Sequence, residues 1–373
     1  MTRVRLFAAT AALVLAAPAA VAQLNASGTV VLVVSGAGQD GGRTRPGFEM
    51  DELSQAYLIF RDNGYAVTIA SPTGGRVVAD PFDSTEAYNA RFLADAKARR
   101  LLEQTIATRT LRAADVAAVY VIGGKGAMFD LPGDTALARL ATEVHARGAV
   151  VGAVCHGPAG LVNAKGPDGK PLLAGRAVTG FSNAEETLFG KKWKAQLPFL
   201  LEDALRQAGA RYEEAPLMMP KVVVDGRIVT GQNPFSTAAS VEAIIRALGK
   251  TPVARTPWRD ERAMTFADRV RQGQGLLVRR ELAAERKETK VELIGMLGYY
   301  QLQGARDDAA VRTALELMEV AAPYMPEPQL SLGIADAYWR LGRQNDARAL
   351  VRAVRAAHPT LAPARELATK FGV

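Results

Sequence analysis

The chain has few of the side chains that most often carry out chemistry: one cysteine, Cys155, and three histidines among 373 residues. A single cysteine excludes an intramolecular disulfide. No group of cysteines and histidines has the spacing of zinc ligands, so we expect no metal and no cofactor. The formal charge of +8 is spread along the chain rather than clustered with aromatic residues. We therefore do not expect nucleic-acid binding.

Long apolar runs are absent beyond the N-terminus. There, Arg3 and Arg5 precede an apolar run over residues 6–17, which is followed by Ala20, Val21 and Ala22. This is the layout of a secretory signal peptide with cleavage after Ala22. The run is too short to span a bilayer. We therefore expect a protein that is exported to the periplasm and has no membrane partner. An uncleaved anchor is the alternative.

Residues 28–250 alternate between strand-like and helix-like segments. Residues 29–35 (TVVLVVS) form a continuous β-branched run, which is typical of a strand buried on both faces of a parallel sheet. Further strands are expected at residues 66–70, 119–122, 149–154 and 221–230, a hairpin at 165–176, and helices at 52–63, 135–147 and 238–248. The alternation predicts a doubly wound, mostly parallel α/β sheet with its site at the carboxyl ends of the strands.

Composition changes after Gly249. Residues 251–258 contain two prolines and no periodicity, which indicates a linker. Residues 259–373 read as a small all-α domain, with a first helix expected near residues 266–285. An internal repeat follows at an offset of 38: Tyr300, Gly304 and Ala309 recur as Tyr338, Gly342 and Ala347. This spacing is similar to that of tetratricopeptide repeats. Partner binding and self-association through this tail are both open, and we expect a homo-oligomer.

The surroundings of Cys155 predict a nucleophile. Cys155 and His156 follow an apolar strand, and Gly157 follows them directly. A sharp turn after a strand lifts such a residue clear of the sheet, and small neighbours permit the turn. The amide groups of a following helix would favour a thiolate and hold an oxyanion. We therefore expect a reactive Cys155 thiolate, against the alternative of a buried structural thiol.

A glycine-rich turn, Gly123-Gly124-Lys125-Gly126, ends the neighbouring predicted strand. Glycines there allow backbone amides to approach a substrate oxygen. A phosphate-binding loop is the competing interpretation, but the Gly-Lys-Ser/Thr signature of such loops is missing.

Several motifs together carry a resemblance to a known family. They are residues 47–52 (GFEMDE), 71–75 (SPTGG), 123–130 (GGKGAMFD), 153–158 (AVCHGP), 179–186 (TGFSNAEE) and 230–234 (TGQNP). The chain over about residues 28–250 resembles the DJ-1/PfpI superfamily and, within it, the heat-shock chaperone and glyoxalase III branch. The resemblance implies a flavodoxin-like fold of the class I glutamine amidotransferase type.

The resemblance also implies roles for individual residues. Cys155 matches the nucleophile, and Glu52 matches an acid that contacts the thiol and moves a proton. His156 is oriented by Glu186, with Glu185 as the alternative. The backbone of Gly124 and His156 would hold an oxyanion. From the residues alone, the favoured interpretation of Glu52 is an acid in the first turn of a helix, and that of Glu186 is a surface carboxylate.

The resemblance implies a cofactor-free, glutathione-independent glyoxalase of the lyase type that acts on a small aldehyde. A thiol amidase or peptidase and a stress-response chaperone that uses the helical tail remain alternatives. The glutaminases of this fold pair their cysteine with a distant histidine. His145 and His358, the only other histidines, lie in the predicted helix before the strand and in the tail, so glutaminase chemistry is not expected. Lys125 stands where this branch often has histidine, and it leaves the substrate open.

Overall fold

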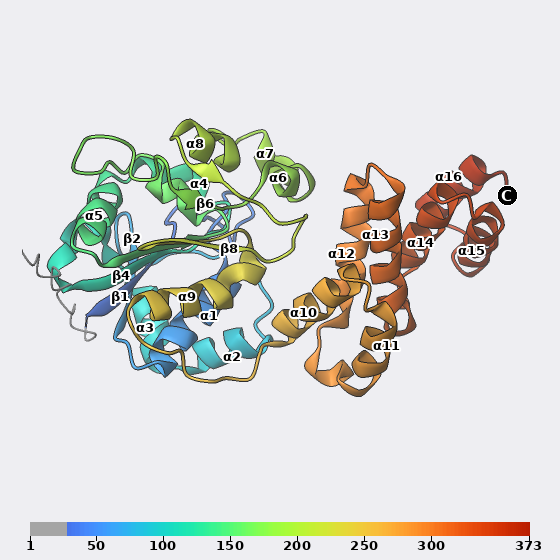
Figure 1. Cartoon of the computed structure of the whole chain (residues 1–373), viewed down its shortest axis with the longest axis horizontal. Coiled ribbons are helices and arrows are strands. Elements are labelled where there is room, and N and C mark those ends of the chain that lie inside the picture. Colours follow the sequence, from blue (N-terminus) through green and yellow to red (C-terminus); the bar gives the residue numbers. More distant parts are fainter. Residues whose placement is uncertain (1–27) are drawn as a thin grey trace, which may run out of the picture.

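The computed structural model describes residues 28–373. The predicted signal peptide, residues 1–22, lies outside this range. The first domain is built on a seven-stranded sheet with the order β3-β2-β1-β4-β5-β9-β8 (Figure 1). The strands of this sheet are β1 (Thr29–Val33), β2 (Val67–Ser71), β3 (Ile106–Ala107), β4 (Val116–Val121), β5 (Val150–Val154), β8 (Val222–Asp225) and β9 (Ile228–Gly231). Neighbouring strands run parallel except β8 and β9, which form a hairpin.

Helices cover both faces of the sheet, as the alternating pattern predicts. One face carries α1 (Met50–Asp62), α2 (Ala87–Ala94), α3 (Ala96–Glu103) and α9 (Thr237–Ala247); the other carries α4 (Ala127–Asp130), α5 (Thr135–Ala146) and α8 (Leu201–Gln207). The central strands β1 and β5 are almost completely buried because both of their faces pack under helices. The predicted doubly wound α/β fold is confirmed.

Smaller elements complete this domain at the carboxyl ends of the strands. They are a two-stranded parallel sheet of β6 (Ala177–Val178) and β7 (Arg211–Tyr212), and the short helices α6 (Asn183–Phe189) and α7 (Lys191–Lys194). The hairpin predicted at residues 165–176 has no paired strands. A single antiparallel bridge joins Lys165 to Pro171 there, because two turns within so short a segment leave no room for a ladder.

The remaining chain is helical, as predicted for residues 259–373. Its helices are α10 (Arg259–Arg271), α11 (Gly275–Ala284), α12 (Val291–Gly304), α13 (Asp308–Ala321), α14 (Pro328–Arg340), α15 (Gln344–Ala357) and α16 (Ala362–Phe371). The single helix predicted at 266–285 is wrong, because Gly273 adopts a φ of 80° and ends α10. Each copy of the sequence repeat is a helix pair, α12 with α13 and α14 with α15. We call residues 259–373 the helical tail.

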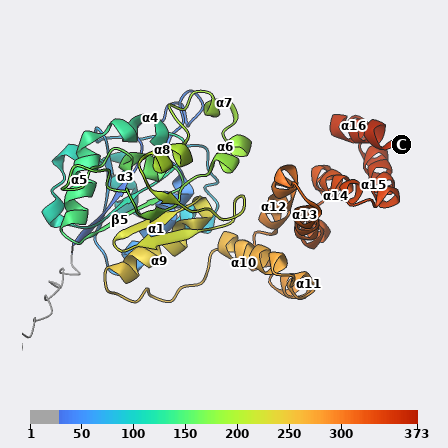
Figure 2. The same cartoon turned by 45° about the horizontal axis from the view of Figure 1, so that its top comes forward.

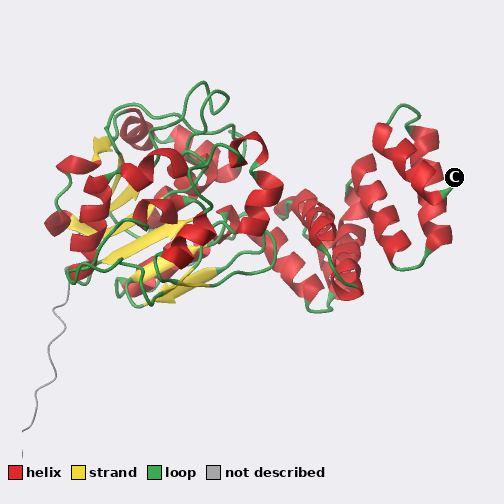
Figure 3. Ribbon diagram, turned by 90° about the horizontal axis from the view of Figure 1, so that it is seen from above, coloured by secondary structure: helices red, strands yellow, loops and turns green. Residues whose placement is uncertain are grey.

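The helical tail extends from one side of the sheet domain (Figures 1 and 3). Its first helix packs against that domain, where Gln55 Nε2 donates to Asp260 Oδ2 at 3.1 Å. Directly before the tail, the ring of Trp258 meets the ring of Tyr88 edge to face. The last helices of the tail, α15 and α16, lie farthest from the sheet. Within residues 28–373, no helix is both long enough and apolar enough to cross a membrane.

Candidate active site

Cys155 occupies a strained turn directly after β5. Its φ is 58°, a left-handed conformation that costs a non-glycine residue of the order of 1–3 kcal/mol. Two backbone hydrogen bonds hold it there: Cys155 N–H donates to the carbonyl of Gly231, and Phe181 N–H donates to the carbonyl of Cys155, both at 2.9 Å. The turn therefore presents the thiol at the carboxyl edge of the sheet, where the sequence predicts the nucleophile.

The glycines around this turn are required by close packing. A Cβ atom on Gly123 would lie 2.7 Å from Cys155 Cβ and 2.8 Å from the His156 nitrogen. Gly124 has a φ of 88°, and a Cβ there would lie 2.5 Å from the Glu49 nitrogen. The loop after β4 thus lies directly against the nucleophile turn on one side and against the start of α1 on the other.

A line of polar contacts runs from Cys155 to Glu186. Cys155 Sγ lies 3.4 Å from His156 Nδ1, and His156 Nε2 lies 2.7 Å from Glu186 Oε2. All three residues are buried, and the ring of Phe181 packs on the imidazole with centroids 4.4 Å apart. Burial lowers the pKa of His156. For Glu186, burial raises the pKa, but the contact with His156 and the charges of Lys125 and Lys194 together outweigh burial and lower it.

These directions fix the protonation of the pair at neutral pH. Glu186 is a carboxylate and His156 is a neutral imidazole. Because Nε2 faces a carboxylate, it carries the ring proton. Nδ1 is then an acceptor that faces the thiol of Cys155, which makes His156 a base for the thiol proton.

Glu52 contacts Cys155 from the other side. It lies in the first turn of α1, completely buried, and its Oε2 accepts a hydrogen bond from Gly123 N–H at 2.7 Å. The thiol lies close enough to the same carboxyl group for each to affect the pKa of the other, and Oε1 makes no hydrogen bond within residues 28–373. Burial, reinforced by the neighbouring carboxyl of Glu49, raises the pKa of Glu52 well above its usual value. The raised pKa favours the protonated, carboxylic acid form of Glu52.

The resting state of Cys155 differs from the predicted thiolate. Burial raises the pKa of the thiol well above its usual value, and the hydrogen bond from the Gly124 amide offsets this only in part. The helix expected after the turn is a short 3₁₀ helix, Gly157–Leu161, so it contributes little dipole. The sequence showed the amide donors but not the depth of burial that outweighs them. At rest the site holds a thiol between a carboxylic acid and a neutral imidazole.

The comparison with known families decides where this chain belongs. The model of the DJ-1/PfpI family matches residues 44–247, which is more than half of the chain and includes each residue of the site. The chain belongs to the DJ-1/PfpI family.

Named proteins and solved structures are similar to this chain over the matched domain. A glutathione-independent glyoxalase of Schizosaccharomyces pombe is 33% identical over 220 residues, covering 54% of this chain and 86% of its own length. The solved Rapid Encystment Protein of Francisella tularensis aligns with a TM-score of 0.56 at 32% identity, over 59% of this chain and 99% of its own. The solved glyoxalase III of Candida albicans aligns with a TM-score of 0.54 at 28% identity, over 59% of this chain and 96% of its own.

Glu185, the alternative partner for His156, has a different place in this DJ-1/PfpI domain. Its Oε2 accepts from Ser182 N–H at 2.9 Å, which forms a capping box at the start of α6. Its Oε1 accepts from three donors at 2.9–3.0 Å: Met218 N, Gln232 Nε2 and Asn233 Nδ2. Glu185 thus ties α6 to the residues around β8 and β9, while Glu186 contacts His156.

Lys125 is half-buried in the loop after Gly124. It makes no ion pair within the described part of the chain, but its charge acts weakly on His156, Glu186 and Glu49, whose pKa values are set mainly by burial or by direct hydrogen bonds. It therefore lies near the site. Of the predicted oxyanion and substrate-binding segment, Gly123 and Gly124 border Cys155, and Lys125 follows them in the loop.

Two neighbours of the site are missing from the sequence-based prediction. Glu49 precedes α1, and burial and nearby carboxyls raise its pKa to about 8. Asp80 accepts a hydrogen bond from Gly47 N–H at 2.7 Å. Glu49 lies within the GFEMDE motif, three residues before Glu52. The sequence alone does not show that its side chain is buried beside the site, so it gave no reason to assign Glu49 a role. Asp80 had no sequence signal.

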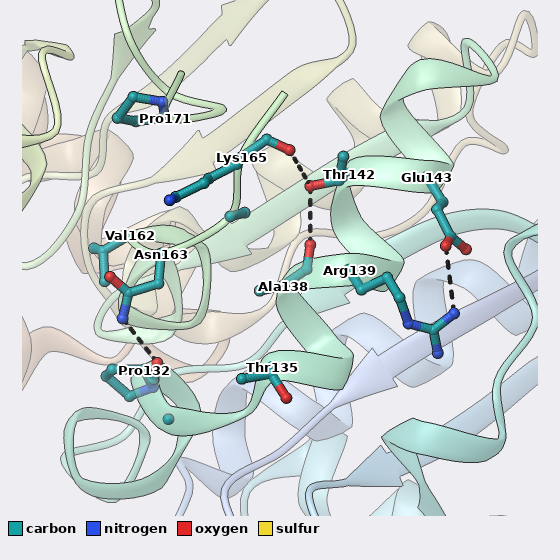
Figure 4. A pocket seen from close by; sticks show the side chains of 12 residues that line it. Pro132, Thr135, Ala138, Arg139, Thr142, Glu143, Val162, Asn163, Lys165 and Pro171 are labelled. Carbon is teal, nitrogen blue, oxygen red and sulfur yellow. Dashed lines mark hydrogen bonds and ion pairs between the residues drawn. The ribbon is translucent and has the colours of Figure 1, made fainter. Parts of the chain in front are cut away.

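A separate cavity of about 790 Å³ lies along α5, away from Cys155 (Figure 4). It is bounded by α5 and the loops around residues 132 and 163, with the Arg139–Glu143 ion pair on its wall. None of its lining residues is a cysteine or histidine, so it does not contain the thiol and imidazole pair of the site. Across residues 28–373, no group of three or more acidic, histidine or cysteine side chains is placed to hold a metal ion.

Proposed function

We propose that this protein is a glutathione-independent glyoxalase, a lyase that converts a small α-oxoaldehyde such as methylglyoxal into a 2-hydroxy acid. The observation that carries the proposal is a buried thiol with a carboxylic acid on one side and a neutral imidazole on the other. This reaction needs a nucleophile and groups that move protons, and the site has both. The names of the similar enzymes of Schizosaccharomyces pombe and Candida albicans support the same chemistry.

The first step joins the aldehyde carbon to Cys155 sulfur. The thiol proton passes to His156 Nδ1 as the carbon–sulfur bond forms, and Glu52 gives its proton to the aldehyde oxygen. The result is a hemithioacetal, an imidazolium and a Glu52 carboxylate. While negative charge develops on that oxygen, the amide of Gly124, which donates to the resting thiol, would turn to the oxygen as its acceptor. The imidazolium is stabilised by the Glu186 carboxylate.

The second step moves hydrogen between the two carbons. The Glu52 carboxylate removes the hydrogen of the former aldehyde carbon, the imidazolium protonates the neighbouring oxygen, and an enediol forms. Glu52 then returns its proton to the second carbon while the hydroxyl on the first carbon gives its proton to His156. The product is a thioester of a 2-hydroxy acid. Water adds to the thioester, Glu52 takes a proton from the water, and the imidazolium protonates the departing sulfur.

The test is turnover without glutathione. Purified protein incubated with methylglyoxal should release lactate, and Cys155→Ala should release none while keeping the wild-type thermal unfolding profile within a few degrees. Absence of lactate from the wild type, or undiminished release from Cys155→Ala, would reject the proposal.

A thiol hydrolase is the second candidate, and the Cys155–His156–Glu186 line of contacts favours it. The same order of nucleophile, base and carboxylate performs acyl transfer in cysteine hydrolases. A panel of amides and peptides distinguishes the two functions. Release of amine that depends on Cys155, with no lactate from methylglyoxal, would favour the hydrolase.

We also propose that the chain is exported to the periplasm and is cleaved after Ala22, as the N-terminal sequence indicates. The mature protein would then begin at Gln23. Mass spectrometry of the protein purified from the producing cells tests this directly. A mass that includes residues 1–22 would contradict cleavage at this position.

A further inference from the structure

The two acids of the site lie on separate helices. Glu52 is on α1 and contacts Cys155, whereas Glu186 is on α6 and contacts His156. They stand at the two ends of the chain of contacts Glu52–Cys155–His156–Glu186. Because α6 is only seven residues long, its position depends on what packs against it.

The helical tail packs against α6. The ring of Phe189, the last residue of α6, meets the ring of Tyr300 on α12 edge to face at 4.7 Å between centroids. Figure 2 shows α6 and α12 side by side where the two domains meet. An aromatic pair in this geometry contributes about 0.5–1.5 kcal/mol beyond the area that it buries. The tail thus fixes the end of the helix that carries Glu186.

The next residue of α12 holds the loop behind α6. Gln301 Nε2 donates to the carbonyl of Leu217 at 3.0 Å, and Gln301 Oε1 accepts from Arg271 of α10 at 2.8 Å. The N–H of Met218, the residue after Leu217, donates to Glu185. A path of direct contacts therefore runs from α12 through Leu217 and Met218 to Glu185, which is adjacent to Glu186.

The same loop enters the apolar core of the tail. Met219 is buried in a cluster with residues of α10, α11, α12 and α13, and Met218 packs against that cluster. The buried tail residues of this cluster are Ala263, Met264, Phe266, Ala267, Val270, Val278, Leu282, Val291, Ile294, Leu297, Leu317, Val320 and Ala321. The loop is consequently a shared part of both domains.

The tail also contacts α1. Gln55, one turn after Glu52 on α1, donates to Asp260 of α10 at 3.1 Å, and both side chains are buried. Thus α10 contacts α1 and α12 contacts α6. Because α10 and α12 share one apolar core, the tail links the two helices that carry the acids of the site.

We propose that the helical tail is a clamp that holds Glu52 and Glu186 at the two ends of the Cys155–His156 pair, with Tyr300 and Gln301 as positioning residues. In this role the tail belongs to the active site although none of its residues touches substrate. Its part in turnover rests on the proposed glyoxalase function, but its effect on His156 and Cys155 does not.

The first measurement is the alkylation of Cys155 by iodoacetamide as a function of pH. Because Cys155 is the sole cysteine, the mass of the intact protein reports this thiol alone. Tyr300→Ala should loosen α6 and weaken the Glu186–His156 contact, so His156 becomes a poorer acceptor for the thiol proton. We expect alkylation near pH 7 to slow by about three- to tenfold, equivalent to a shift of about half to one pH unit in the profile.

Matched variants separate positioning from a general loss of structure. Tyr300→Phe keeps the ring and should restore the wild-type profile. Gln301→Met keeps the volume but removes the bond to Leu217, so it should shift the profile in the same direction as Tyr300→Ala; it also carries the test if Tyr300→Ala fails to fold. Met296→Ala, at an exposed position on α12, is the control and should leave the profile unchanged.

Turnover of methylglyoxal is the second measurement. If the clamp acts as proposed, kcat falls in Tyr300→Ala and Gln301→Met, and the acid limb of the kcat/KM profile, which reports the pKa of His156, moves to lower pH while the alkylation profile moves to higher pH. Wild-type alkylation profiles in both variants would overturn the clamp. Shifted alkylation profiles in a protein that releases no lactate would uphold the clamp and reject the glyoxalase.

Discussion

Replacing Glu186 by glutamine tests the central assignment of the site, that a carboxylate supports His156 as it takes the thiol proton. Glutamine has nearly the same shape, and its carbonyl oxygen can still accept from Nε2 of His156 across the present 2.7 Å contact. The substitution therefore removes a charge while keeping a hydrogen bond. The domain should stay folded, because the substitution removes a buried ion and leaves the packing in place.

The size of the effect follows from the kind of bond that is lost. A hydrogen bond to a charged group contributes about 1.5–3 kcal/mol, compared with about 1 kcal/mol for a neutral one. The imidazolium formed during attack should therefore lose about 1–2 kcal/mol of stabilisation, and kcat should fall by about five- to thirtyfold.

The pKa of His156 determines the direction in which the pH profile of kcat/KM should move. His156 must be neutral to accept the thiol proton, so activity rises as pH rises through its pKa. The Glu186 carboxylate raises that pKa against the dominant lowering effect of burial, and its loss lowers the pKa further. The acid limb of kcat/KM for Glu186→Gln should move to lower pH.

The assay is lactate release from methylglyoxal between pH 5 and pH 9, alongside thermal unfolding of each variant. Glu143→Gln is the control, because this exposed carboxylate on α5 pairs with Arg139 and not with His156. It should leave kcat and the acid limb unchanged. Wild-type kcat and an unmoved acid limb in Glu186→Gln would refute the role given to Glu186.

Three further substitutions test other parts of the site. Glu52→Gln should abolish lactate release. Burial raises the pKa of Glu52 in the folded state, so the wild type loses stability as pH rises above the unfolded pKa of this group. Glutamine does not ionise, so the unfolding temperature of the variant should rise relative to that of the wild type between pH 5 and pH 8. Gly123→Ala should lower the free energy of unfolding by about 1–3 kcal/mol in denaturant titrations and reduce turnover, because its methyl group meets Cys155 and His156; unchanged stability would contradict the close packing. Cys155→Gly should be more stable than Cys155→Ala by about 1 kcal/mol, because the φ of 58° suits glycine; equal stabilities would show that the turn is unstrained.

The sheet and the turn at Cys155 were accessible from sequence because their signals are local, whereas the roles of Glu52 and Glu186 were predicted only through the family resemblance. Buried parallel strands appear as β-branched runs, and the turn at Cys155 is marked by Gly157 and by the glycines of the neighbouring loop. The break at Gly273 was missed because a single glycine inside a helical pattern reads as tolerated.

The protonation of the site was not accessible in the same way. The sequence shows that amides and acids surround Cys155, but the pKa of the thiol depends on how completely water is excluded, and that depends on packing from several distant segments. The contact of Tyr300 with Phe189 is likewise a long-range contact between two domains. No periodicity within either segment encodes it.

The raised pKa of Cys155 also bears on the chemical lifetime of the protein. Peroxides and disulfides react with thiolates far faster than with thiols. A nucleophile that rests as a buried thiol is therefore shielded from oxidants that would inactivate a standing thiolate, and it becomes reactive only when a substrate arrives to share its proton with His156. Burial therefore makes Cys155 a weaker acid and at the same time slows its oxidation.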